Sequence, residues 1–209
     1  TNYEPCPPSV TCSGSSSVTI KWTASTSYGC GTPTSYDVKR MNRITGQAET
    51  LKSGTTSTSY TDSQPFPGIN TYGVTAINSY GSGSGTAISS AIGIAAPTFY
   101  DGISADSHVV YIDIKGLNVP EDWKPYYTLE LYWSTSYSGY YTLQGSWKYN
   151  EYAVNLGNNN YCYTYDFGNS VDFSGKTYYY KLRWVFEAPY SPTRVEGSYT
   201  SVKSVTHHK

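Results

Sequence analysis

The stretch Tyr72-Gly-Val-Thr-Ala-Ile-Asn-Ser-Tyr-Gly81 alternates without a break between two sets of side chains. Every second residue from Tyr72 to Asn78 falls on one face of an extended chain, and the residues between them fall on the other. This period of two predicts a β-strand. The turn-forming segment 65–68 introduces the strand, and the Ser/Gly-rich run that follows Gly81 predicts a loop at its end.

A second strand of this kind occurs near the C-terminus, in Gly175-Lys-Thr-Tyr-Tyr-Tyr-Lys-Leu-Arg-Trp184. In the first half, a turn followed by Tyr-x-Val-x-Ala-x-Asn-x-x-Gly resembles strand F of a fibronectin type III domain. The resemblance covers this whole half through further residues of its alternating strands: Trp22, Tyr36, Val38, Tyr60 and Asp62. It implies an all-β chain of two tandem immunoglobulin-like (fibronectin type III) β-sandwiches, one in 1–95 and a divergent, tyrosine-rich one in 96–209.

Short alternating segments between turns predict the strands of both sandwiches. In the first half they are 1–12, 18–22, 36–40, 49–51, 57–62, 72–81 and 86–92. In the second half they are 110–114, 127–133, 178–184 and 200–205, with a hairpin over 132–143 and no assignment within 144–173. The resemblance implies a corner tyrosine before strand F. That position holds Asn70 in the first half and Tyr178 in the second.

The two halves place their large core residues differently. Trp22 and Ala76 of the first half correspond to Ile114 and Trp184 of the second. Because a protein core is close-packed, moving an indole from one sheet to the other keeps the core volume roughly constant. This exchange is typical of two diverged copies of one fold.

Composition and charge limit the classes of function. The chain has 209 residues, of which 38% are hydrophobic and 14% are charged, and its net charge is −1. This balance argues against nucleic acid or an anionic membrane as the partner, because both require a basic surface. No apolar run approaches the roughly twenty residues that membrane insertion requires. We expect the chain to be part of a longer polypeptide.

Residues with catalytic or metal-binding chemistry are few. The three histidines are His108, His207 and His208, and we expect the last two to be disordered at the chain end. His108 has no cysteine or carboxylate at ligand spacing, and the chain contains no catalytic or phosphate-binding motif. The sequence therefore predicts a protein that is not an enzyme and has no cofactor and no metal.

Four cysteines leave two alternatives open. In the sandwich, Cys6 opens the first strand and Cys30 lies in a loop at the same end, so these two residues can form a disulfide. Cys12 lies roughly 20 Å from Cys6 along an extended strand, too far to pair with it. Cys162 is alone in the second half. The alternatives are one bond between Cys6 and Cys30, which implies an oxidising compartment, and four reduced thiols.

Tyrosine is concentrated in the second half, which holds 18 of the 24 tyrosines. Tyr132 and Tyr179 fall on outward positions of their strands and are candidate binding residues. One interpretation is cross-strand pairing on a solvated sheet, with Glu130 against Lys181 or Arg183. The other is a contact face for a partner, because tyrosine supplies a large area at a low entropic cost.

Two loops of the second half contribute the remaining candidates. The loop 118–125 holds Trp123, and the loop 187–194 holds Tyr190 and Arg194. Exposed together, these residues have the composition of a binding hot spot. The alternative is that they pack in the joint between the two sandwiches, at the short linker 95–97.

Together these observations predict a non-catalytic binding or spacer module of a larger secreted or cell-surface protein, acting in adhesion or protein interaction. The alternative is a carbohydrate-binding accessory module of an extracellular enzyme, in which exposed aromatic rings stack on sugars. Coplanar aromatic rings in a groove would favour a carbohydrate ligand. A flat or loop-borne aromatic cluster would favour a protein. The sequence does not identify the ligand.

Overall fold

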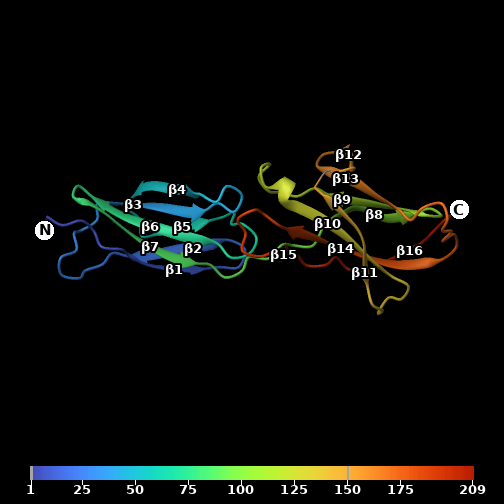
Figure 1. The fold of residues 1–209 in the computed structure, drawn as a ribbon, viewed down its shortest axis with the longest axis horizontal. Helices are drawn as coiled ribbons and strands as arrows, with labels where there is room; N and C mark the ends of the chain where they lie inside the picture. The colour runs from blue at the N-terminus through green and yellow to red at the C-terminus, as the bar shows by residue number, and fades with distance from the viewer. Residues whose placement is uncertain (1, 150) are drawn as a thin grey trace. The chain divides into compact units, whose positions relative to one another are not determined.

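The computed structural model describes residues 2–149 and 151–209. Their regular elements are strands β1 to β16 and one turn of 3-10 helix, Lys124–Tyr126 (Figure 1). Among these residues, no helix is long and apolar enough to cross a membrane. The contacts within the chain divide it into two units. The first is Thr1–Gly93 with Ala188–Thr193, and the second is Ile94–Glu187 with Arg194–Lys209.

The first unit consists of two antiparallel sheets. One has the order β1-β2-β5, and the other has the order β4-β3-β6-β7. These strands are β1 (Ser9–Ser13), β2 (Val18–Thr23), β3 (Ser35–Met41), β4 (Ala48–Thr55), β5 (Ser59–Asp62), β6 (Thr71–Asn78) and β7 (Gly81–Ile88). The order places strands A, B and E of an immunoglobulin-like sandwich opposite strands C′, C, F and G.

Alternating residues of the central strands form the core of the first unit. Tyr72, Val74 and Ala76 of β6 are fully buried, as the period of two predicts. The facing strands add further buried side chains: Val18, Ile20, Trp22, Tyr36 and Val38. Trp22 and Tyr36 meet edge to face, with ring centroids 5.6 Å apart. The inner and outer faces of these strands therefore follow directly from the sequence pattern.

The prediction of a loop after Gly81 is wrong, because the Ser/Gly-rich run forms β7, paired along its length with β6. Its glycines lie opposite core residues, and the N-terminal segment takes the place of their missing side chains. A Cβ on Gly83 would lie 2.3 Å from the carbonyl oxygen of Pro5, and a Cβ on Gly85 would lie 2.1 Å from that of Pro8. Only glycine permits so close an approach of two backbones.

The first strand begins later than predicted, at Ser9 instead of residue 1. The residues before it are joined to the loop after β2 by a disulfide between Cys6 and Cys30, whose Cα atoms lie 5.2 Å apart. The bonded alternative is thus the one in the structure, while Cys12 and Cys162 are free thiols.

Asn70 occupies the position of the missing corner tyrosine and is fully buried. Its Nδ2 donates hydrogen bonds to the carbonyl oxygens of Phe66 (2.8 Å) and Gly68 (3.3 Å), and its Oδ1 accepts one from the Phe66 N–H (3.0 Å). The side-chain amide therefore holds the turn that leads into β6.

The second unit repeats the arrangement with more strands. One antiparallel sheet has the order β12-β13-β9-β8, and the other has the order β11-β10-β14-β15, with β16 also paired to β14. The strands are β8 (Phe99–Ala105), β9 (Val109–Lys115), β10 (Tyr127–Ser134), β11 (Thr142–Lys148), β12 (Val154–Gly157), β13 (Asn160–Asp166), β14 (Thr177–Phe186), β15 (Val195–Glu196) and β16 (Lys203–Thr206). The unassigned segment 144–173 contains most of β11 and all of β12 and β13.

The core of the second unit is aromatic. Ile114 and Trp184 are 0% and 2% exposed, and their counterparts Trp22 and Ala76 are equally buried, so the exchange of the indole between the sheets is present in the structure. Tyr178, at the corner position, is buried against Trp133 and Phe173, with ring centroids 4.9 and 4.8 Å away.

The expectation that His207 is disordered is wrong. Its side chain is 1% exposed and lies among aromatic rings that include Phe173 and Tyr178. Its N–H donates a hydrogen bond to the carbonyl oxygen of Lys176 (3.0 Å), which continues the pairing of β16 with β14. Residues near a chain end are usually disordered, but the buried imidazole of His207 holds the segment after β16 in place.

Candidate functional site

The outward face of strands β10 and β14 brings together the tyrosines and charges of the second unit. In the register of these antiparallel strands, Glu130 lies opposite Arg183, Tyr132 opposite Lys181, and Ser134 opposite Tyr179. Residues directly opposite in such a pair project to the same side of the sheet. The pairing of Glu130 with Arg183 is one of the two that the sequence predicts.

Glu130 is the centre of a buried ionic network. Its side chain is only 4% exposed, and Oε2 accepts hydrogen bonds from Arg183 Nε (2.8 Å) and from the Tyr132 hydroxyl (2.8 Å). Arg194 Nη2 pairs with the other oxygen, Oε1. Arg183 also binds Glu196, with Nη1–Oε2 and Nη2–Oε1 distances of 2.6 and 2.9 Å. Two arginines therefore face two carboxylates, and the network has no excess charge.

Burial alone would raise the pKa of the Glu130 carboxyl. The hydrogen bonds from Arg183, Arg194 and Tyr132 outweigh this effect, so the pKa lies below its usual value. Burial and the bond to Glu130 raise the pKa of the Tyr132 hydroxyl. Glu130 is consequently ionised and Tyr132 is a neutral donor at neutral pH. Their hydrogen bonds with one another and with Arg183 hold these side chains in place on this face of the sheet.

The cationic groups of Lys181 and Arg183 lie over tyrosine rings on the same face of the sheet. Lys181 Nζ lies 3.9 Å from the ring centroid of Tyr199 and 4.5 Å from that of Tyr141. The Arg183 guanidinium lies 5.0 Å from the centroid of Tyr199 and 5.2 Å from that of Tyr132. The Tyr132 and Tyr199 rings meet edge to face at 88°. These distances are typical of cation–π contacts, and the rings are not coplanar.

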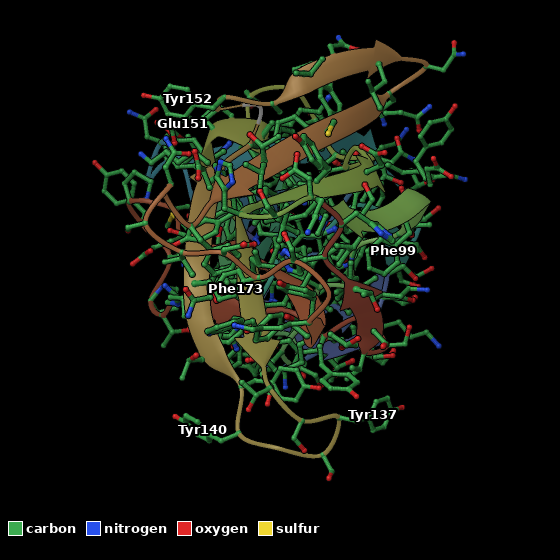
Figure 2. All side chains as sticks on the ribbon, turned by 90° about the vertical axis from the view of Figure 1, so that its right-hand side faces the viewer. Phe99, Tyr137, Tyr140, Glu151, Tyr152 and Phe173 are labelled. Carbon is green, nitrogen blue, oxygen red and sulfur yellow. A yellow bond between two sulfur atoms is a disulfide. The ribbon has the colours of Figure 1, made fainter. Side chains whose placement is uncertain are left out.

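The β10–β11 hairpin extends the face with exposed aromatic side chains. Tyr137 and Tyr140 are 64% and 88% exposed, and Figure 2 shows both on the loop beyond the strands, on opposite sides of that loop. Tyr137 packs edge to face on Tyr179, with centroids 5.9 Å apart, and its carbonyl oxygen accepts a hydrogen bond from the Tyr141 hydroxyl. We define the tyrosine face by these side chains: Tyr132, Tyr137, Tyr140, Tyr141, Tyr179, Lys181 and Tyr199.

Three of the predicted binding residues, Tyr132, Tyr179 and Arg194, lie on or beside the tyrosine face. Arg194 was expected next to Trp123 and Tyr190 but pairs with Glu130 instead, a contact across 64 residues of sequence. The hairpin tyrosines and Tyr199 were missed. The cluster of three tyrosines between 137 and 141 was the only sequence feature that could have indicated the hairpin residues as binding residues.

Trp123 and Tyr190 do not join this face. Trp123 is 5% exposed. Tyr190 is 56% exposed and belongs to the segment Ala188–Thr193 of the first unit, where its N–H donates to the carbonyl oxygen of Arg43 (2.9 Å). Their packing in an interdomain joint stays a prediction.

Ser107, His108 and Asp166 are a serine, a histidine and an aspartate that lie near one another, as in a hydrolytic triad. Ser107 Oγ lies 2.8 Å from His108 Nδ1, but His108 Nε2 lies 3.9 Å from Asp166 Oδ1, which exceeds a hydrogen bond. Asp166 Oδ1 instead accepts the Gly168 N–H at 2.7 Å. Within 2–149 and 151–209, no group of three or more histidine, cysteine or acidic side chains is placed to hold a metal ion.

The sheet orders and the antiparallel pairing define the class: an all-β chain with two immunoglobulin-like sandwiches in tandem. No protein-family model matches the sequence, and no curated protein matches it. A solved structure with a similar chain trace is that of the chicken CNTN1 FN1-FN3 domains, at 12% identity. The similarity covers 98% of this chain and 67% of that chain, with a TM-score of 0.39.

Proposed function

We propose that the chain is a non-catalytic binding or spacer module of a larger secreted or cell-surface protein, and that it contacts a protein partner through the tyrosine face. The observation that carries this proposal is the exposure of Tyr137 and Tyr140 on the hairpin between β10 and β11, where Tyr137 packs on Tyr179 of the face. A tyrosine side chain has few rotatable bonds, so it buries a large area at a low entropic cost, and tyrosine is enriched in protein interfaces for this reason.

The ring arrangement favours a protein over a sugar as the ligand of this face. A sugar stacks its C–H surface on an open, flat aromatic ring, but the Lys181 ammonium and the Arg183 guanidinium already lie over the Tyr199 ring. The edge-to-face packing of Tyr137 on Tyr179 removes another flat platform. Protruding tyrosines beside charged groups instead resemble the side of an interface that inserts into a partner's pocket.

The disulfide between Cys6 and Cys30 supports the proposed location. Disulfides form and persist in oxidising environments and are rare in the cytosol. Secreted proteins and cell surfaces provide such an environment.

An array of purified secreted and surface proteins tests the binding function. The wild-type chain is compared with a Tyr137→Ser/Tyr140→Ser variant and with a Tyr28→Ser control, because Tyr28 is fully exposed in the first unit. Binding that is lost in the double variant and retained in the control supports the tyrosine face. Binding that survives the double variant contradicts it.

A further inference from the structure

An open pocket of about 470 Å³ lies at one end of the other sheet of the second unit, formed by β12, β13, β9 and β8. Its size is within the range of small-ligand sites. Its lining is one aromatic ring, one ammonium, one glycine and four amides: Tyr100, Lys115, Gly116, Asn118, Asn158, Asn159 and Asn160. Neither the ionic network nor the tyrosine face contributes to it.

The pocket wall is preformed by the β12–β13 turn. Asn158 and Asn159 have φ angles of 51° and 59°, the left-handed region that asparagine tolerates best after glycine. The Gly116 N–H donates a 2.6 Å hydrogen bond to the carbonyl oxygen of Asn159. A Cβ at Gly116 would lie 2.3 Å from Asn159 Oδ1, so the turn packs directly on backbone at the end of β9.

Asn160 is the most enclosed of the four amides. It is only 9% exposed, yet within the described residues its side-chain amide has no hydrogen-bond partner, although it lines the pocket. Its polar atoms are not among the fully buried atoms that lack a partner, so water in the open pocket reaches this amide, and a ligand there would replace that water. Asn118 and Asn158 are exposed, so their amides are hydrated donors and acceptors that line the same pocket. Lys115 is paired with no carboxylate in the part of the chain that the structure describes.

We propose that this pocket binds one sugar residue of a glycan, and that the sugar carries a carboxylate. Each amide offers both a donor and an acceptor, which suits vicinal hydroxyl groups that also donate and accept. The 55% exposed Tyr100 provides a ring on which the C–H surface of a sugar packs. The Lys115 ammonium pairs with the carboxylate. The site lies on a different sheet from the tyrosine face, so the two functions are independent.

Saturation-transfer NMR and titration calorimetry of the full chain test this site, with glucuronic acid, N-acetylneuraminic acid and glucose as probes. We expect at least one acidic sugar to bind more tightly than glucose. Tyr100→Ala should weaken that binding roughly tenfold or more, because the stacked apolar area is lost. Tyr100→Phe should retain it. Lys115→Gln should remove the preference for the acid.

The Tyr152→Ala variant is the matched control and should bind like the wild type, because Tyr152 is 84% exposed in the same unit and does not line the pocket. Thermal unfolding of each variant checks that the second unit is folded. Three outcomes overturn the proposal: none of the three sugars binds, Tyr152→Ala removes binding while Tyr100→Ala does not, or Lys115→Gln leaves the preference for the acid unchanged. None of these outcomes bears on protein binding by the tyrosine face, because that array assay uses different variants.

Discussion

The hydroxyl of Tyr180 lies 2.8 Å from Nε2 of His207, and both side chains are buried. The other imidazole nitrogen, Nδ1, lies 2.7 Å from the carbonyl oxygen of Asp106. A carbonyl oxygen can only accept, so Nδ1 carries the proton and Nε2 accepts from Tyr180. The neutral imidazole therefore satisfies both contacts and ties the segment after β16 to β14 and to the end of β8.

This contact predicts a pH-dependent stability of the second unit. Burial lowers the pKa of His207 below its usual value, whereas the unfolded chain titrates near about 6.5. The unfolded state then binds the proton more readily, so the contribution of His207 is fully present above about pH 6.5 and declines as the pH falls below it. Urea unfolding of the wild type and of His207→Gln between neutral pH and about pH 5 measures the difference. A wild type that loses no more stability than the variant would contradict this account.

Trp184 tests the core of the second unit. Trp184→Ala should lower the free energy of unfolding by about 3–5 kcal/mol, because it empties a large buried site. Leu143→Ala is the control. Leu143 is 49% exposed, so its loss should change the free energy by less than about 1 kcal/mol. Denaturant unfolding gives both values, and equal small losses would place Trp184 outside the core.

Glu130 tests the ionic network. Glu130→Gln removes the charge that Arg183 faces in a buried position, and breaking a buried pair typically costs about 3–5 kcal/mol. The control is Glu121→Gln, since Glu121 pairs with Lys124 but is 86% exposed, and it should cost well under about 1 kcal/mol. Chemical unfolding compares the two variants. A Glu130→Gln protein as stable as the control would mean that Arg183 is not buried in solution.

The disulfide stabilises the first unit by restricting its unfolded chain. Cys6 and Cys30 are 24 positions apart, and closing a loop of that size contributes roughly 3 kcal/mol. Cys6→Ser/Cys30→Ser should lose this amount in urea, whereas Cys162→Ala should leave the first unit unchanged. Peptide mapping without reductant is the direct measurement, and four free thiols would refute the bond.

Sequence predicted what depends on local alternation and missed what depends on distant neighbours. The inward faces of Trp22 and Tyr72 follow from a period of two. The strand at 81–88 does not, because its glycines are explained only by Pro5 and Pro8 lying against them. The ionic network shows the same limit. The pairing of Glu130 with Arg183 could be predicted because it follows from strand register, whereas the pairing of Glu130 with Arg194 could not, because Arg194 lies on a loop far away in the sequence.

The closed loop between Cys6 and Cys30 also determines how the first unit behaves under mechanical load. When the chain is pulled from its two ends, tension that reaches Cys6 crosses the sulfur–sulfur bond to Cys30. The residues between them, which include β1 and β2, then carry no load. At about 3.4 Å per residue, this removes about 80 Å from the length to which the unit can be stretched. Reduction of this one bond would therefore lengthen the fully stretched unit by that amount.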